Sequence, residues 1–224
     1  MEMKYETIKE GDMLRIISLK DFSDVKKGDR GGLIASEDNL SQEGNCWVYH
    51  DARVYGNAEV RHNAIVSGKA KVFGDAKIYD NARVCDYAKV YGRAGIYDYA
   101  KVHGCAEVYD HARVYEHADV GGGDVAAYEY ANIHGNAEVR DHARVYGHAC
   151  VYDDAWVYGY ASVYERAVAC KDARIHGSTE VCGNEHIYED IVTIQTRHAE
   201  KVSAAFRGLL SDMNFKLIND DKNL

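Results

Sequence analysis

A small or aliphatic residue recurs every six positions along most of the chain, with one slip of a single residue. The first run has 13 members from Val48 to Val120, and the second has 11 from Ala127 to Ile187. Alanine stands four residues after almost every member. A helix with about 3.6 residues per turn cannot keep this period on one face, whereas a short strand followed by a corner can. The pattern predicts 24 short strands with the aliphatic residue inward and its charged and tyrosine neighbours outward.

The positions between these strands hold mainly Gly, Asp, Asn and His, which are typical of tight corners. Glycine, and less readily Asn and Asp, adopts a positive φ. Proline has a fixed negative φ and no N–H to donate to a neighbouring strand. The 224-residue chain contains no proline. We therefore expect corners with positive φ and backbone N–H groups that are engaged in hydrogen bonds.

The segments GNAEVR, GDAKIY and GNAEVRDHARVYGHA resemble the hexapeptide-repeat family. The resemblance covers residues 48–187 and implies an all-β fold, a left-handed parallel β-helix of about eight triangular coils. More narrowly, KYETIKEGDMLRI, DVKKGDRGG and NLSQEGNCWVY resemble the YdcK-like group of uncharacterised hexapeptide proteins, whose relatives include phage and prophage proteins. That group supplies no established chemistry.

The two ends of the chain interrupt the repeat. We predict an N-terminal cap over residues 1–47, the β-helix over 48–191 and a C-terminal segment over 192–224. In the last segment Ala199, Val202 and Phe206 follow the spacing of an amphipathic helix. This helix is expected to cover the exposed edge of the last coil. The alternative is that it contacts a partner subunit.

Net charge is −9 with His neutral, which argues against nucleic acid as the partner. No apolar run approaches the roughly 18 residues of a transmembrane helix, and the first residues lack the apolar core of a signal peptide. We therefore expect a cytoplasmic protein with no membrane partner. The charge is uneven, because residues 53–113 contain ten Lys and Arg against seven Asp and Glu, whereas residues 114–190 contain five against fourteen. An anionic ligand is expected in the first part.

With three hexads per coil, outward residues 18 apart form columns. One column is aromatic at every position from Tyr55 to Tyr164, and the next face has a second column that includes Tyr79 and Tyr97. Stacked rings would stabilise neighbouring strands. Two other roles stay open: a cationic and aromatic strip that holds a flat anionic ligand, or a subunit interface. The strip comprises Arg53, Lys71, Lys89, Tyr55, Phe73 and Tyr91.

The single slip of the repeat lies in a glycine-rich segment on the remaining face. There Gly121 would lie between His103 below and Arg140 above, with His142 at the same corner one coil up. Exposed backbone N–H groups and an arginine suit an anion, and histidine, which as a residue type titrates near neutral pH, suits a general base. The alternative is that the extra residue simply needs glycine to fit. The predicted ligand-binding residues are Gly121, Gly122, Gly123, Asp124 and Arg140, and the predicted bases are His103 and His142.

These features support two functional hypotheses. The first is a non-catalytic binding or scaffold protein, by resemblance a phage-type accessory, that forms a trimer and binds a small anionic molecule or a protein. The second is a CoA-dependent acyltransferase with a histidine base near the Gly121–Asp124 bulge, and only this one needs acetyl-CoA. No metal site is expected, because histidines six residues apart lie on different corners. We favour the first, since the chain shows no complete catalytic set. Trp47 and Trp156, at outward positions of the same face, indicate a contact surface.

Overall fold

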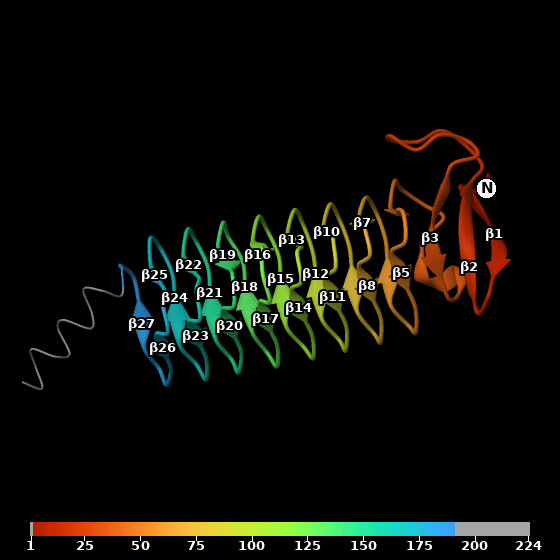
Figure 1. The fold of residues 1–224 in the computed structure, drawn as a ribbon. Helices are drawn as coiled ribbons and strands as arrows, with labels where there is room; N and C mark the ends of the chain where they lie inside the picture. The colour runs from red at the N-terminus through yellow and green to blue at the C-terminus, as the bar shows by residue number, and fades with distance from the viewer. Residues whose placement is uncertain (1, 191–224) are drawn as a thin grey trace, which may run out of the picture.

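The computed structural model describes residues 2–190, which form a parallel β-helix with a small antiparallel cap (Figure 1). Strands of adjacent turns pair 18 residues apart, as Arg53 does with Lys71. The aliphatic residues of the repeat are all buried, and so are the alanines that follow them. The predicted all-β fold and its 24 repeat strands, β4 to β27, are therefore confirmed.

The repeat strands form three faces, each a stack of parallel strands. Face one contains β4 (Trp47–Val48), β7 (Ile65–Val66), β10 (Arg83–Val84), β13 (Lys101–Val102), β16 (Asp119–Gly121), β19 (Glu138–Arg140), β22 (Trp156–Val157) and β25 (Arg174–Ile175). Face two contains β5 (Arg53–Val54), β8 (Lys71–Val72), β11 (Lys89–Val90), β14 (Glu107–Val108), β17 (Ala126–Ala127), β20 (Arg144–Val145), β23 (Ser162–Val163) and β26 (Glu180–Val181). Face three contains β6 (Glu59–Val60), β9 (Lys77–Ile78), β12 (Gly95–Ile96), β15 (Arg113–Val114), β18 (Asn132–Ile133), β21 (Cys150–Val151), β24 (Val168–Ala169) and β27 (His186–Ile187).

The corners between strands have positive φ, as the absence of proline predicted. The corner residue is often Gly, but Asp, Glu, His and Lys also adopt this conformation, for example Asp86 at φ 60° and Glu165 at φ 59°. Many of these acidic corners accept a hydrogen bond from the corner N–H of the next turn. The Asp86 carboxylate accepts from Gly104 N at 3.1 Å, and the Glu165 carboxylate accepts from Gly183 N at 2.8 Å. Side-chain capping between turns therefore satisfies N–H groups that proline would not possess.

The N-terminal cap is a β-hairpin that leads directly into the stack. Strands β1 (Tyr5–Glu10) and β2 (Met13–Ser18) pair antiparallel, and β2 pairs antiparallel with β3 (Arg30–Ile34). Strand β3 then pairs in parallel with β5, and after the 3-10 helix η1 (Glu37–Asn39) Leu40 bridges Val60. Parallel stacking thus begins before residue 48, where we placed the start of the β-helix. Within residues 2–190, face two has nine parallel strands, one more than the other faces.

The outward position of Trp47 is covered by the cap rather than available to a partner. Trp47 is 1% exposed, and its ring centroid lies 5.4 Å from that of Phe22 and 6.1 Å from that of Tyr5. The contact surface that we expected at this residue is therefore used within the chain. Trp156, by contrast, is 42% exposed.

The predicted C-terminal segment, residues 192–224, lies outside the residues that the structure describes. Between residues 2 and 190, no helix has the length and apolar character that crossing a bilayer requires.

Candidate functional site

Seven aromatic rings stack along face two, as the sequence column predicted. Neighbouring ring centroids are 4.8–5.0 Å apart and the planes are parallel within 4°. This spacing matches the separation of about 4.8 Å between adjacent strands. We call this column the aromatic ladder, and its members are Tyr55, Phe73, Tyr91, Tyr109, Tyr128, Tyr146 and Tyr164.

The ladder cannot hold a flat ligand between its rings. Each internal ring already has a ring against both of its faces, so insertion of another plane would require separation of hydrogen-bonded strands. In the described part of the chain, only the outer faces of Tyr55 and Tyr164 lack a ladder neighbour. A ligand on face two would therefore meet ring edges and the cations beside them.

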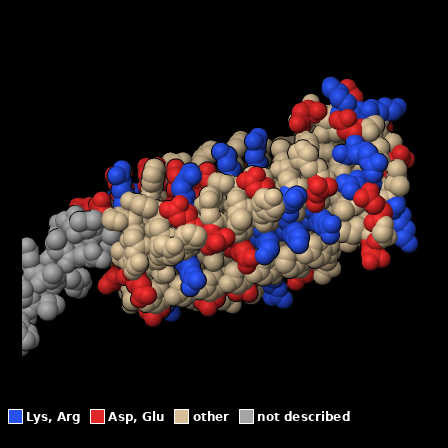
Figure 2. All heavy atoms as spheres, in the orientation of Figure 1, with Lys and Arg blue, Asp and Glu red and all other residues tan. Residues whose placement is uncertain are grey.

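A basic strip lies beside the N-terminal part of the aromatic ladder, on β5, β8 and β11. Arg53, Lys71 and Lys89 are exposed and stand in register on adjacent strands. Figure 2 shows Lys and Arg gathered over these strands. Lys89 is paired with Glu107 at 2.7 Å, whereas among residues 2–190 neither Arg53 nor Lys71 forms an ion pair.

An open depression adjoins the first two members of the strip. It has a volume of 430 Å³ and is lined by Asp51, Arg53, Lys69 and Lys71. Lys69 Nζ lies 5.4 Å from the ring centroid of Tyr87, a cation–π contact that holds this ammonium at the rim. Three cations against one carboxylate give the depression a positive potential.

On face one, the glycine-rich slip brings His103, Gly121 and Arg140 together as the sequence predicted. Gly121 pairs with Arg140 on the next turn, and a Cβ on Gly121 would lie 2.7 Å from the ring of His103. His103 Nε2 lies 2.7 Å from Asp119 Oδ1. The glycine thus makes room for an imidazole that a carboxylate holds in place.

Carboxylates at the same site pair with its cations. Arg140 donates from Nε to Glu138 at 2.7 Å and lies 3.7 Å from Asp119. Both acids are half-buried, with side chains 26% and 21% exposed. An incoming anion would compete with these carboxylates, so the arrangement supports an oriented histidine better than an anion site.

The corner that follows, Gly121–Asp124, is shaped by packing. The extra residue lets Val125 take the buried position that alanine holds elsewhere. Gly122 has φ 83°, and a Cβ on Gly123 would collide with the carbonyl of Asp141. The glycines are therefore required to fit the inserted residue, which was our alternative explanation for them.

His142 has partners of its own at this corner. Its Nδ1 lies 3.7 Å from Asp124, and its ring stacks on Tyr160 at 4.8 Å. Similar histidine–tyrosine stacks occur at other corners, as between Tyr130 and His148. These contacts are sufficient to explain a histidine at the corner.

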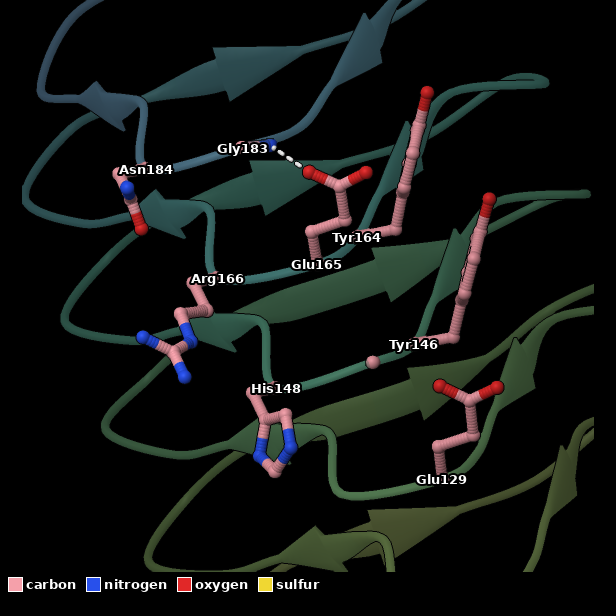
Figure 3. A pocket seen from close by; sticks show the side chains of 9 residues that line it. Glu129, Tyr146, His148, Tyr164, Glu165, Arg166, Gly183 and Asn184 are labelled. Carbon is pink, nitrogen blue, oxygen red and sulfur yellow. Dashed lines mark hydrogen bonds between the residues drawn. The ribbon is translucent and has the colours of Figure 1, made fainter.

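A groove lies beside the C-terminal part of the aromatic ladder, and the sequence pattern did not predict it (Figure 3). It has a volume of 520 Å³ and runs between the edges of Tyr146 and Tyr164 and a corner column on the other side. Glycines open it, because Gly147 and Gly183 alternate with acidic corner residues. The alternation of Gly with Glu every 18 residues was the available sequence signal. The lining residues are Glu129, Tyr146, Gly147, His148, Tyr164, Glu165, Arg166, Gly183 and Asn184.

The groove has mixed charge. Figure 3 shows Glu129 and Glu165 between the tyrosine edges and the side chains of His148, Arg166 and Asn184. Glu165 is already occupied by the N–H of Gly183. Across residues 2–190, no three His, Cys, Asp or Glu side chains converge in the manner of a metal site.

Two segments of the chain match the YdcK β-solenoid repeat, residues 52–68 and 143–159. Each segment spans three consecutive strands, β5–β7 and β20–β22, and so corresponds to one turn. The chain carries YdcK-type β-solenoid repeats. Among curated proteins it is similar to the uncharacterized acetyltransferase YdcK of Escherichia coli K12, with 54% identity over 35 residues. The match spans 16% of this chain and 11% of that protein. The likeness to YdcK therefore concerns a short stretch of each chain.

Proposed function

We propose that this protein is a non-catalytic β-helix binding module that holds a small anionic ligand on its basic strip. The observation that carries the proposal is the in-register pair of Arg53 and Lys71, exposed and without ion-pair partners among residues 2–190. Like charges directly opposite on neighbouring strands destabilise a sheet. A bound anion would relieve this repulsion, so ligand binding gives a physical reason for the arrangement.

The surroundings of this pair favour a small polar ligand. The depression is open, and Lys69, one of the residues that line it, contacts the ring of Tyr87. Ring edges of the ladder, rather than ring faces, border the strip. Anionic groups are therefore the recognised feature, and flat aromatic groups contribute little. We further propose that the module acts as a trimer, in which exposed tyrosines such as Tyr99 and Tyr160 meet other subunits.

The test is calorimetry with citrate and with pyrophosphate as probes, alongside native mass spectrometry of the purified protein for a retained anion. The variant Arg53→Gln/Lys71→Gln is expected to weaken probe binding at least tenfold and to lose any retained anion. Arg144→Gln removes a cation from the equivalent position of face two in the acidic part of the chain, and it should bind like the wild type. Failure of both probes together with no retained anion, or equal weakening by Arg144→Gln, would contradict the proposal.

A second candidate function is a CoA-dependent acyltransferase with His103 as general base. The observation in its favour is the His103–Asp119 contact of 2.7 Å, and the name of the YdcK relative points the same way. If Asp119 accepts from Nε2–H, the neutral imidazole keeps Nδ1 free to take a proton from an acceptor hydroxyl or amine.

This candidate is tested by release of free CoA from acetyl-CoA with a panel of amine and hydroxyl acceptors. Turnover that is lost in both His103→Ala and Asp119→Asn, but kept in His142→Ala, would favour the enzyme over the binding module. Absence of turnover and of acetyl-CoA binding in calorimetry would eliminate it.

A further inference from the structure

Face three has a gap in its outward side chains at Gly95. This glycine pairs with Lys77 on the turn below and with Arg113 on the turn above. Both of these cations are exposed, and among residues 2–190 neither forms an ion pair. Their backbones lie about 9.6 Å apart, which is twice the strand spacing. Both side chains are long enough to meet above the glycine.

The ring of Tyr97 fills this gap. A Cβ on Gly95 would lie 2.5 Å from Cζ of Tyr97, and the nearest atoms also include the phenol oxygen. The sequence column predicted that Tyr97 stacks in line with Tyr79, but the two rings cross at 62° with centroids 5.9 Å apart. Gly95 therefore lets Tyr97 lie across the face, with its hydroxyl between the two cation-bearing strands.

A third cation reaches the same place from the corner between faces two and three. A hollow of 370 Å³ is lined by Asp75, Lys77, Arg93, Tyr97, His111 and Arg113. The only carboxylate among them, Asp75, lies 3.9 Å from Arg93 in a loose and exposed contact. The hollow thus contains three permanent cations and one anion, with an aromatic floor.

We propose that this hollow is a binding site for a phosphate group of a small molecule. A tetrahedral dianion offers enough oxygens to accept from Lys77, from the Arg113 fork and from the Tyr97 hydroxyl together. A carboxylate has only two oxygens and one charge. Hydrogen phosphate also carries an O–H group that can donate a hydrogen bond to the Asp75 carboxylate, whereas sulfate has no such group. The site lies on face three and shares no residue with the basic strip, so it stands or fails independently of the proposed function.

The test is calorimetric titration with inorganic phosphate, sulfate and acetate at one ionic strength. We expect phosphate to bind more tightly than sulfate and acetate to bind at least tenfold more weakly than phosphate. Arg113→Gln and Lys77→Gln should each weaken phosphate binding about tenfold. Tyr97→Phe keeps the ring over Gly95 and removes one donor, so a smaller loss of about threefold to tenfold is expected.

Two controls separate this site from general charge effects. Arg83→Gln and Lys101→Gln each remove an exposed cation from face one of the same part of the chain, and neither residue belongs to the basic strip or to the hollow. Both should bind phosphate at this site like the wild type. Unchanged binding in Arg113→Gln, or equal weakening in Arg83→Gln, would overturn the site, and sulfate binding as tight as phosphate would overturn its assignment to phosphate. Thermal unfolding of each variant shows whether the fold is retained.

Discussion

Replacing Tyr128 by alanine removes one internal ring of the aromatic ladder. Tyr128 contacts Tyr109 at 5.0 Å and Tyr146 at 4.9 Å, both in nearly parallel planes. Tyr55, at the end of the ladder, has a single ladder neighbour, Phe73 at 4.9 Å. Because the two positions occupy the same slot of the repeat, they differ mainly in the number of stacked neighbours.

The number of stacked neighbours in the structure sets the expected loss of unfolding free energy for each variant. An aromatic pair contributes about 0.5–1.5 kcal/mol beyond the area that it buries. Tyr128→Ala loses two pairs, so the stacking loss is about 1–3 kcal/mol, while Tyr55→Ala loses one pair and about half as much. Tyr128→Phe keeps both pairs and should change the free energy of unfolding little, since Phe73 already stands in the ladder.

Urea unfolding followed by far-ultraviolet circular dichroism measures these differences. A solenoid can unfold in stages, so variants are compared only where the slope of the transition is unchanged. A double-mutant cycle on Tyr109 and Tyr128 should give a coupling free energy near that of one pair, whereas Tyr55 and Tyr128 should be additive. Equal losses for Tyr55→Ala and Tyr128→Ala, together with no coupling between Tyr109 and Tyr128, would refute stacking as the source of the stability.

Three further predictions follow from the cap, the corners and the phenols. Trp47→Ala empties a buried site and should lower the free energy of unfolding by about 3–5 kcal/mol in chemical denaturation; a loss below 1 kcal/mol would show that the cap does not contribute to the core. Glu165→Gly should lower the midpoint of thermal unfolding less than Glu165→Val does. Both variants lose the acceptor for Gly183 N–H, but valine must also adopt a positive φ at this corner, at a cost of about 1–3 kcal/mol. Burial and a neighbouring glutamate raise the pKa of Tyr79 and Tyr91 to about 12, and a raised phenol pKa means that the folded state favours the neutral form. Stability from these phenols is therefore fully present below the unfolded pKa of about 10 and is lost as pH rises towards 12, so phenolate absorbance should appear at higher pH in folded than in urea-unfolded protein; coincident titrations would contradict this.

The columns of outward residues in the sequence did not predict which cations pair with carboxylates. Those columns placed Lys71 and Lys89 in one strip. In the structure the two side chains differ, because Lys89 forms an ion pair with Glu107, whereas Lys71 forms no ion pair among residues 2–190. In the same way Arg140 appeared as a free anion ligand, yet Glu138 and Asp119 compensate it. Such pairings depend on the rotamers of long side chains, which a spacing rule does not determine.

The six-residue period by itself determined the strands, the buried valines and alanines, the positive-φ corners and the column order. Each follows from a local requirement that repeats identically along the chain: inward packing of one residue, a corner that only certain residues tolerate, and an N–H that proline lacks. The tertiary structure decided the rest, where one turn departs from its neighbours. Trp47 became core because the cap folds over it, Tyr97 turned because Gly95 left space, and His103 met Asp119 because the next turn placed the carboxylate beside it. These outcomes arise from contacts between turns, in which the shape and charge of one particular neighbour outweigh the average preference of the repeat.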